Sequence, residues 1–459
     1  MGCARQSRME AGEPQDCTSW LPDELALRIL SYLDAKDILQ VAQTCQRWRE
    51  LAEDEGLWQG KCKADGIEEP LHISTATGSR PRPWKSAYTN QLRVDTNWHR
   101  GRFRTITLDL LRDYLDLHRV GFNGKELVCT IHYEIIKVWS AVTGECPRTL
   151  VGHRASVTAV QMRDHMIVTG YEDGTVKVWN AESGECIHTL GGHTSHIHNV
   201  HLHEQRAASC STDLTIRVWD IEAGQCLHTL LGHKLAVTWV WYNGRRLVSE
   251  DFSNVVKMWD PETETCLLSV CLHSGAFITF VQFDGKHIVS LLCPGRTIGV
   301  WDGETLEHTR TITGNEPYTT LMTLKNSILG VVNSGRAAEI WNVETGQRLN
   351  LLQDPNGFDP YAHDLALRGD FLIGRTGTGR ITLWDWRTGQ FLQNLFVPKR
   401  EETLAPHLLV SNTKLVFSVA SKWGALAYWP HKVLVLDFDV KERAKKKNPF
   451  SVLSWVVPS

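Results

Sequence analysis

The stretch Arg217–Asp220, which reads Arg-Val-Trp-Asp, is one of several short strand-like segments built around a tryptophan. Lys137–Ser140 and Lys177–Asn180 have the same form, and the tryptophans recur along the chain at Trp139, Trp179, Trp219, Trp259, Trp301, Trp341 and Trp384. Successive tryptophans are 40, 40, 40, 42, 40 and 43 residues apart. A period of about 40–45 residues with a Trp-Asp signature is typical of a propeller in which each repeat forms one four-stranded blade. We therefore predict an all-β propeller for most of the chain.

Strand-like sequence continues beyond the last of these tryptophans. Leu415–Phe417 and Val433–Asp437 still have the pattern of strands, so a closing eighth blade is needed, with Leu436 at the tryptophan position. The first blade lacks the Gly-His pair of later repeats, and Asp109–Leu117 is the candidate for the outer strand that closes the ring. We predict eight blades, seven of them marked by tryptophan.

Blades two and three repeat a set of polar residues similar to the buried hydrogen-bond network of WD-repeat blades: His153, Thr169, Asp173 and Trp179, then His193, Ser209, Asp213 and Trp219. Polar groups that are buried together must satisfy one another. Blade four keeps the histidine, serine and tryptophan but has Ser253 where the aspartate is expected. Later blades lose further members, and we expect those blades to be looser.

The composition excludes several classes of protein. The 459 residues include 49 basic and 52 acidic side chains, and the net charge of −3 creates no field that attracts nucleic acid or a membrane. Four of the twelve cysteines lie 40 residues apart and mark one blade position. No apolar stretch approaches about 18–20 residues. We expect a reduced intracellular compartment, cytoplasmic or nuclear, and neither a membrane nor a nucleic-acid partner.

The sequence contains no motif that indicates catalysis. Phosphate-binding Gly-x-x-x-x-Gly-Lys, His-Glu-x-x-His and Gly-x-Ser-x-Gly are all absent from the sequence. A dense histidine run is the one candidate metal site: His193, His196, His198, His201 and His203. However, His193 belongs to the blade network, and strand alternation separates His198 from His201 and His203. We expect no catalytic residue, cofactor or metal.

A helical pattern precedes the propeller. Pro22 suits the first turn of a helix, and an apolar stripe with a period of 3.6 residues follows it: Leu25, Ala26, Ile29, Leu30 and Leu33. Asp34 has the position of a helix cap before a second helix that contains Ile38 and Leu39. A bundle of about 40 residues buries little surface. Its apolar edge should therefore be covered, either by a partner or by the propeller that the bundle would cap.

Leu21-Pro22 through Leu33, Leu39 and Trp48 resembles an F-box. Blade phrases such as Lys137–Gly144 and Arg217–Cys226, with the ending Leu434–Val440, resemble the archipelago-type F-box/WD-repeat adaptors. The resemblance implies an F-box (20–65), a helical linker region (66–104) and a propeller (105–440), and the polar start and basic end of the sequence add a disordered leader (1–19) and a basic tail (441–459). It further implies an F-box contact with a Skp-type adaptor through Leu21, Pro22, Leu25, Ile29, Leu33 and Leu39.

That family supplies the non-catalytic substrate-recognition subunit of Skp–cullin–F-box ubiquitin ligases, so the resemblance implies a cullin–RING ligase partner and a protein substrate marked for proteasomal degradation. The alternative is an adaptor-binding decoy, or a propeller scaffold, without ubiquitination substrates. Because only about twenty residues precede the F-box, we expect a monomeric receptor. The basic run Lys441–Lys447 is either a nuclear signal or a solvated tail.

The expected substrate pocket departs from the family. The resemblance places phosphate-reading arginines at three positions that here hold other residues, His198, Thr212 and Thr238, and further pocket positions are changed at Thr158, Glu172 and Phe252. Each lost guanidinium removes charge-assisted hydrogen bonds of about 1.5–3 kcal/mol, so the inherited phosphate recognition should be lost. Arginines occur instead in later blades, at Arg336 and Arg375 and also at Arg296 and Arg380. They either hold a substrate acid or phosphate, or result from drift of exposed loops.

Overall fold

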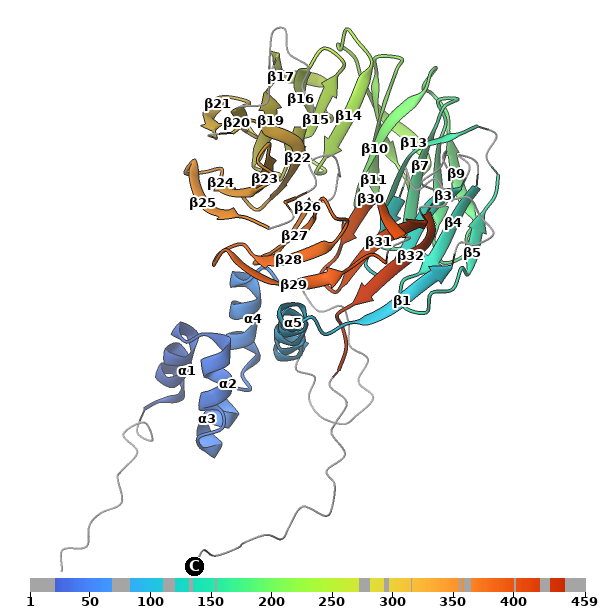
Figure 1. The fold of residues 1–459 in the computed structure, drawn as a ribbon. Helices are drawn as coiled ribbons and strands as arrows, with labels where there is room; N and C mark the ends of the chain where they lie inside the picture. Colours follow the sequence, from blue (N-terminus) through green and yellow to red (C-terminus); the bar gives the residue numbers. More distant parts are fainter. Residues whose placement is uncertain are drawn as a thin grey trace, which may run out of the picture. The chain divides into compact units, whose positions relative to one another are not determined.

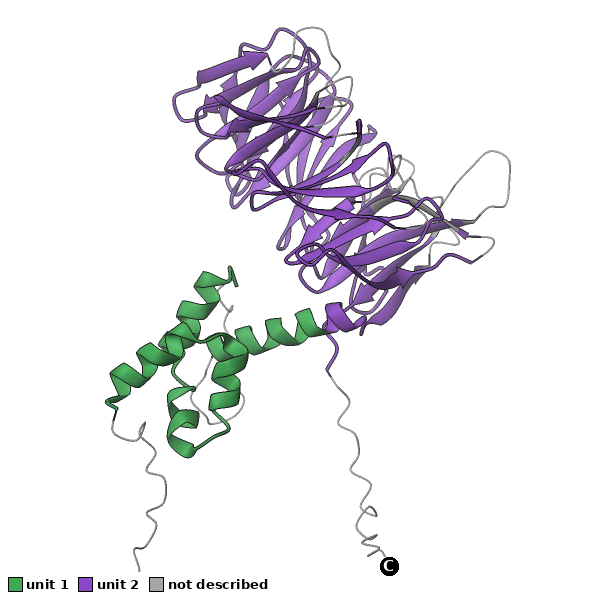
Figure 2. Cartoon of the chain, turned by 60° about the vertical axis from the view of Figure 1, so that its left-hand side comes forward, with its two compact units in different colours: residues 1–96 green, residues 97–459 purple. Residues whose placement is uncertain are grey.

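The computed structural model describes residues 21–67, 83–109, 120–131, 135–152, 155–271, 281–292, 297–314, 316–354, 357–358, 365–399, 402–421 and 430–441. The chain divides into two compact units, residues 1–96 and residues 97–459 (Figure 2). The predicted leader, His153, Arg296 and all but the first residue of the basic tail lie outside the described residues.

Unit 1 is helical. Its described elements are α1 (Asp23–Tyr32), α2 (Ala35–Val41), α3 (Gln46–Leu51), α4 (Glu55–Ala64) and the first part of α5 (Pro83–Arg100). The Asp34 carboxylate caps α2 by accepting a hydrogen bond from the Asp37 amide at 2.8 Å, as the sequence predicts. A small core forms where the helices meet, around Ala26, Leu30, Ile38, Trp58 and Cys62.

Helix α5 contributes side chains to the cores of both units. Within unit 1, the Trp84 amide donates to the Glu55 carboxylate at 2.9 Å. The last turn of α5 belongs to unit 2, where the Trp98 ring stacks on Phe438 with 3.6 Å between ring centroids. The Asn97 side-chain amide donates to the Phe438 carbonyl at 2.8 Å. The end of α5 is therefore fastened to the residues that follow the last strand of the propeller.

Within the described ranges, unit 2 consists of eight four-stranded sheets, one for each blade (Figure 1). This confirms the predicted blade number. Blade one contains β2 (Val120–Phe122), β3 (Glu126–Ile131), β4 (Ile135–Ser140) and β5 (Arg148–Leu150). Blade two contains β6 (Val157–Arg163), β7 (Met166–Tyr171), β8 (Val176–Asn180) and β9 (Cys186–Leu190). Blade three contains β10 (Ile197–His203), β11 (Arg206–Ser211), β12 (Ile216–Asp220) and β13 (Gln225–Leu230).

The next three blades repeat this order. Blade four contains β14 (Val237–Tyr242), β15 (Leu247–Asp251), β16 (Val255–Asp260) and β17 (Thr265–Cys271). Blade five contains β18 (Val281–Phe283), β19 (His287–Leu292), β20 (Thr297–Asp302) and β21 (His308–Thr313). Blade six contains β22 (Tyr318–Lys325), β23 (Ile328–Asn333), β24 (Ala338–Asn342) and β25 (Gln347–Leu352).

Blade seven contains β26 (Leu365–Arg368), β27 (Phe371–Arg375), β28 (Ile381–Asp385) and β29 (Gln390–Phe396). Blade eight contains β30 (Glu402–Val410), β31 (Lys414–Ser421), β32 (Pro430–Asp437) and β1 (Arg104–Asp109). Buried side chains of neighbouring blades form shared clusters. One of these joins blade eight to blade one through Val416 and Val435 on one side and Leu127 and Trp139 on the other.

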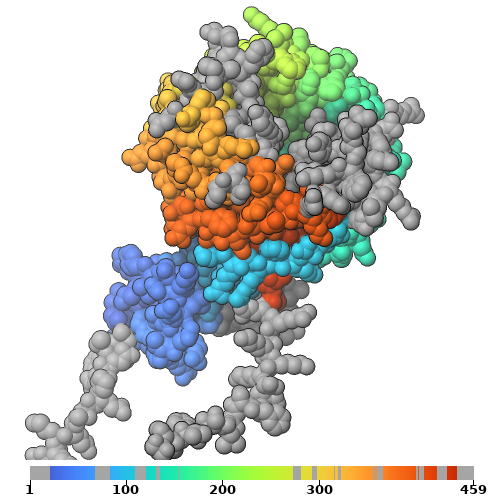
Figure 3. Space-filling model, viewed as in Figure 1, coloured from blue at the N-terminus to red at the C-terminus, as the bar shows by residue number. Residues whose placement is uncertain are grey.

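The ring closes by pairing the two ends of unit 2. Strand β1 runs antiparallel to β32, with Arg104 opposite Asp437 and Leu108 opposite Val433. Figures 1 and 3 show the cyan start of this unit against its orange and red end. The predicted closing strand, Asp109–Leu117, is therefore wrong: the closing strand ends at Asp109, and residues 110–119 lie outside the described part. Ile106 and Leu108 fix the register because alternate residues of β1 enter the core.

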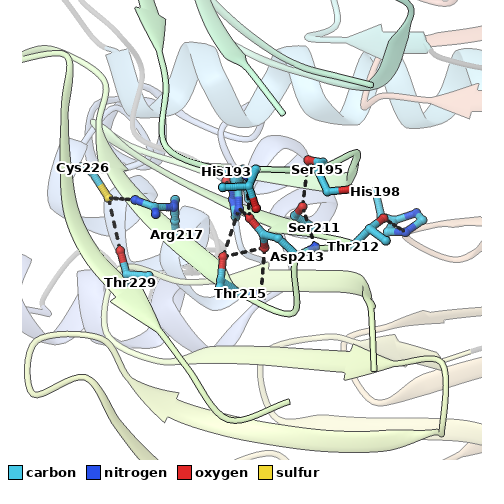
Figure 4. A network of polar contacts seen from close by, with 12 residues as sticks. His193, Ser195, His198, Ser211, Thr212, Asp213, Thr215, Arg217, Cys226 and Thr229 are labelled. Atoms are coloured by element: carbon cyan, nitrogen blue, oxygen red, sulfur yellow. Dashed lines mark hydrogen bonds and ion pairs between the residues drawn. The ribbon is translucent and has the colours of Figure 1, made fainter. Parts of the chain in front are cut away.

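The polar network of blade three is complete, and blade four completes its own by another route. In blade three, His193 Nδ1 lies 2.8 Å from the Asp213 carboxylate (Figure 4). The other ring nitrogen, Nε2, lies 2.8 Å from Ser209 Oγ. In blade four, His233 Nδ1 lies 2.7 Å from Asp251, and the Ser253 hydroxyl donates to that carboxylate at 2.6 Å. The predicted gap at Ser253 is thus wrong, because Asp251 reaches the histidine from two residues earlier.

Blade six has a different network. The Glu339 carboxylate, 2% exposed, accepts hydrogen bonds from Trp341 Nε1 at 3.1 Å and from the Tyr318 hydroxyl at 3.2 Å. The Asn333 side chain donates to the same carboxylate at 3.0 Å. Blade six therefore replaces the expected network rather than losing it. In blade five, by contrast, the buried Ser290 hydroxyl has no hydrogen-bond partner within the described ranges.

We predict that Asp251→Ala lowers the free energy of unfolding by about 2–4 kcal/mol, because it leaves the buried His233 without its acceptor. Ser253→Ala removes one hydrogen bond from an exposed residue to Asp251 but leaves the contact between His233 and Asp251 in place, so it should cost only about 1 kcal/mol. Urea unfolding followed by tryptophan fluorescence measures both. Equal effects of the two substitutions would show that Asp251 has not taken over the aspartate position.

Candidate functional site

One face of α1 exposes large apolar side chains. Leu25 is 48% exposed, Ile29 45% and Tyr32 77%, and their spacing places them along one side of the helix. We call these three residues the α1 apolar face. Ala26 and Leu30, which belong to the same predicted stripe, are instead buried in the unit 1 core. The predicted stripe therefore divides into residues that pack in the core of unit 1 and residues that are exposed on its surface.

The predicted adaptor contacts differ in accessibility. Pro22 is exposed beside the α1 apolar face, and Leu21 is half-buried, with its carbonyl accepting a hydrogen bond from Arg47. Leu33 and Leu39 are partly buried and pack against the core of unit 1. The sequence reasoning missed Tyr32, although its distance of three residues from Ile29 is the signal that could have found it.

Five turns of the propeller share one geometry. Each turn follows the second strand of its blade, and its fourth residue has a left-handed backbone and donates its amide to the carbonyl of the first: Gly174, Leu214, Asn254, Arg336 and Gly379. We call these the second-strand turns. They lie at the same end of their sheets, because each links the second strand to the third. Glu172, Thr212, Phe252 and Arg336, all predicted substrate contacts, are exposed residues of these turns.

The structure brings three of the predicted contacts together between blades three and four. Thr212 Oγ1 lies 3.0 Å from His198 Nε2 (Figure 4). The His198 ring meets Phe252 edge to face, with 5.7 Å between ring centroids. Phe252 is 63% exposed. We call His198, Thr212 and Phe252 the histidine–aromatic cluster; its surface is uncharged when His198 is neutral.

Neighbouring predicted contacts are less accessible. The Thr238 hydroxyl donates to the Glu250 carbonyl at 3.2 Å. Burial, with a smaller contribution from the nearby Asp251 charge, raises the pKa of Glu250 to about 7. Thr158 is 5% exposed and its hydroxyl donates to the Gly170 carbonyl at 3.0 Å, so that hydroxyl is already occupied. A dianionic phosphate would find no arginine at these positions.

The predicted arginines lie elsewhere, on blades six and seven. Arg336 is exposed in its second-strand turn, and it lines a surface cavity of about 370 Å³ together with Gly335, Ala337, Gln353 and Asp354. Arg375 is half-buried at the end of β27, where its backbone pairs with Ile381. The structure thus does not join these arginines to the histidine–aromatic cluster of blades three and four.

Inner strands of neighbouring blades are joined by side chains that accept backbone amides. Gln161 accepts from the Leu202 amide, Gln282 from the Leu324 amide, and His201 Nδ1 from the Tyr242 amide at 3.2 Å. Burial, the nearby His203 and Arg163 lower the pKa of His201 to about 4, against a smaller opposing effect of the Tyr242 hydrogen bond. His201 therefore has a structural role equivalent to that of the two glutamines.

Within the described part of the chain, no group of three or more histidine, cysteine, aspartate or glutamate side chains could hold a metal ion. A search of the same residues found no helix that has both the length and the apolar character of a membrane span.

Comparison with known protein families finds matches to part of each unit. An F-box-like model matches residues 19–64, and the model of the WD domain, G-beta repeat, matches residues 144–180, 184–220 and 224–260. Residues 19–64 are thus similar to an F-box, and three consecutive stretches of the propeller are similar to WD repeats. The WD-repeat matches contain the strands from β5 to β16, whereas the strands from β17 onward follow the last match.

Several F-box proteins are similar to this one over part of its length. F-box/WD repeat-containing protein 7 of Drosophila melanogaster is 40% identical over 163 residues, which are 33% of this chain and 12% of that protein. An F-box protein of Saccharomyces cerevisiae is 31% identical over 29% of this chain and 24% of its own length. The probable E3 ubiquitin ligase complex SCF subunit sconB of Arthroderma otae is 29% identical, again over 29% of this chain and 24% of its own length.

The match to these three relatives thus spans between 12% and 24% of their length. The crystal structure of Ika8, a computationally designed protein, matches 72% of this chain and 99% of its own with a TM-score of 0.59 and 28% identity.

We predict that acid destabilises the WD-repeat propeller. His201 keeps a pKa of about 4 when folded but has its ordinary value of 6.5 when unfolded, so the unfolded state binds the proton first as the pH falls. The free energy of unfolding should drop by up to about 3 kcal/mol between pH 6.5 and pH 4. Burial also lowers the pKa values of His193 and His233, although their aspartate partners oppose this effect. These two histidines therefore also lower the free energy of unfolding as the pH falls.

His201→Gln is the matched variant, because Gln161 of blade two and Gln282 of blade five each accept the equivalent amide of the next blade. Its unfolding midpoint in urea should depend less on pH than that of the wild type. An identical pH dependence in the two proteins would show that His201 does not titrate on unfolding.

Proposed function

We propose that this F-box/WD-repeat protein is a non-catalytic substrate-recognition subunit of a Skp–cullin–F-box ubiquitin ligase. In this proposal, unit 1 binds a Skp-type adaptor and through it a cullin–RING ligase, and the propeller binds a protein that is then ubiquitinated and degraded by the proteasome. The name of the sconB relative, an SCF ubiquitin ligase subunit, supports this assignment.

The observation that carries the proposal is the α1 apolar face. Three large side chains are open on one helix of a small bundle, within the residues that the F-box-like model matches. Burying a leucine or isoleucine side chain contributes about 1.5–3 kcal/mol, so a partner that covers this face gains substantial affinity. Polar surroundings, such as Asp23, Glu24 and Arg28, would form the rim of the contact.

The propeller supplies the second binding surface of the proposed receptor. Its second-strand turns carry exposed side chains of varied chemistry on a framework whose strands are paired and buried. Binding residues on loops of a rigid scaffold are the usual arrangement for recognition. The histidine–aromatic cluster offers stacking and hydrogen bonding where the family resemblance expects arginine, so we propose a substrate range different from phosphate-dependent recognition.

The adaptor contact is tested by the double substitution Leu25→Ala and Ile29→Ala. Both side chains are exposed, so the bundle should still fold, and the affinity for a Skp-type adaptor should fall at least tenfold if each contributes about 1 kcal/mol or more. Leu349→Ala with Leu351→Ala is the control, because these leucines are exposed to a similar degree on β25 of the propeller. Surface plasmon resonance with the purified adaptor measures all three proteins, and unchanged affinity of the first variant would refute this contact.

A decoy that binds the adaptor without delivering a substrate is separated from a receptor by a second measurement. Quantitative proteomics of cells with and without the chain should reveal a protein that accumulates on removal, and the Leu25→Ala/Ile29→Ala variant should fail to reverse it. A chain that binds adaptor but changes the abundance of no protein acts as a decoy.

A further inference from the structure

The second-strand turn of blade six holds Arg336 in a fixed position. The Arg336 amide donates to the Asn333 carbonyl at 2.9 Å, and the Arg336 carbonyl accepts from the Phe358 amide at 2.8 Å. The Asn333 side chain accepts from the Ala337 amide at 3.0 Å and donates to the buried Glu339 carboxylate. Arg336 has φ 61°, a backbone conformation that residues other than glycine rarely adopt. The turn is therefore anchored to the blade six network on one side and to the blade seven connection on the other.

Two glycines leave the space that the Arg336 side chain occupies. A Cβ atom at Gly357 would lie 2.8 Å from Arg336 Cβ, and a Cβ atom at Gly377 would lie 2.8 Å from a guanidinium nitrogen of Arg336. The two glycine segments are themselves joined, because the Gly377 amide donates to the Gly357 carbonyl at 2.9 Å. The guanidinium thus rests on bare backbone, and we call Arg336, Gly357 and Gly377 the arginine slot.

The guanidinium of this slot makes no hydrogen bond or ion pair with any residue in the described ranges. Other propeller arginines do: Arg148 lies 2.9 Å from Glu126, and Arg246 lies 2.8 Å from Asp260. An exposed arginine alone would be an ordinary solvated charge. Arg336 differs because its backbone is fixed, its stem is packed, and its five N–H donors remain available beside a cavity.

The lining of the cavity selects among anions. Besides Arg336, its described lining includes the neutral Gln353 and the acidic Asp354. A carboxylate can accept two parallel hydrogen bonds from one guanidinium and carries a single charge. A phosphate dianion would bring twice that charge to a lining whose described residues include one arginine and one acidic residue.

Resting on the proposed receptor function, we propose that the arginine slot binds a single carboxylate of an unphosphorylated acidic segment of the substrate. Charge recognition then lies between blades six and seven, and the histidine–aromatic cluster makes no contribution to it.

Selection from a phage-displayed library of random twelve-residue peptides, which carry no phosphate, tests this proposal on the full-length chain. Wild-type protein should enrich aspartate or glutamate at one fixed peptide position. Arg336→Gln should lose that enrichment. Arg245→Gln, which changes an exposed arginine in the first hairpin turn of blade four, at the opposite end of the sheet, should keep it. Retention of the acidic preference in Arg336→Gln, or its absence from the wild type, would overturn the proposal.

Affinity measurements with one selected peptide then identify the anion. Replacing its acidic residue by glutamine should weaken wild-type binding about tenfold, the loss expected for a charge-assisted pair. A phosphoserine at the same position should bind no more tightly than glutamate, whereas Asp354→Asn should improve the phosphoserine peptide more than the glutamate peptide. Tighter binding of phosphoserine by the wild type would show that the slot reads phosphate and would contradict the carboxylate assignment.

Gly377→Ala tests the position of the guanidinium without removing its charge. Gly377 does not have a left-handed backbone, so alanine is compatible with the chain there, but its Cβ displaces the Arg336 guanidinium. Peptide affinity should fall several-fold while thermal stability changes little. Wild-type affinity in this variant would show that the slot geometry is irrelevant.

Adaptor binding is measured on the same preparations. Arg336→Gln should bind the Skp-type adaptor as the wild type does. If the wild type bound no adaptor but kept its acidic preference, the receptor function would fail and the slot would stand. If adaptor binding were intact and the acidic preference did not depend on Arg336, only the slot would fail.

Discussion

The antiparallel pairing of β1 with β32 is the contact on which the propeller depends. A repeat array has two open ends, and each end leaves the apolar face of its terminal blade uncovered. Here the first strand of unit 2 completes the last blade, so neither end of the array is left open. Arg104 and Asp437, 3.0 Å apart, lie at one end of the pair, and Leu108 packs into the core shared with blade one. The stacking of Trp98 on Phe438 holds the residues on either side of these strands together.

Closure also explains why blades with altered polar networks can persist. A blade in a closed ring is covered on both faces by its neighbours, so its apolar clusters remain buried even when its polar network changes. Blade six uses Glu339 and Asn333, blade four uses Asp251, and the buried Ser290 hydroxyl of blade five makes no hydrogen bond within the described ranges. The polar network can therefore differ from blade to blade, whereas the closed ring and its apolar interfaces preserve the fold.

The period of the tryptophans predicted the propeller and seven of its blades, because spacing reports the size of a repeating unit directly, and the strand pattern beyond the last tryptophan predicted the eighth. It could not predict which strand closes the ring: Arg104–Asp109 has no tryptophan and its partner is more than 300 residues away in sequence. Nor could it assign Asp251 to the network, since a carboxylate can reach the same histidine from two different positions of a turn. Of the candidate site, His198, Thr212 and Phe252 were named because the family resemblance places pocket residues at these positions of the repeat. Arg336 could be named but not explained, because the slot depends on glycines from two other segments.

The second-strand turns show why recognition can change while the fold does not. In five blades the fourth residue of the turn has the same left-handed backbone and the same amide-to-carbonyl hydrogen bond, although its side chain is glycine, leucine, asparagine or arginine. The turn is defined by backbone bonds and by the strands that it joins, so the side chain at its fourth position is exposed at Leu214 and Arg336 and carries little of the folding energy. Such a position can gain or lose a charge at little cost in stability. A propeller that holds other residues where the family resemblance expects arginine can for this reason present an arginine in another part without rebuilding any blade.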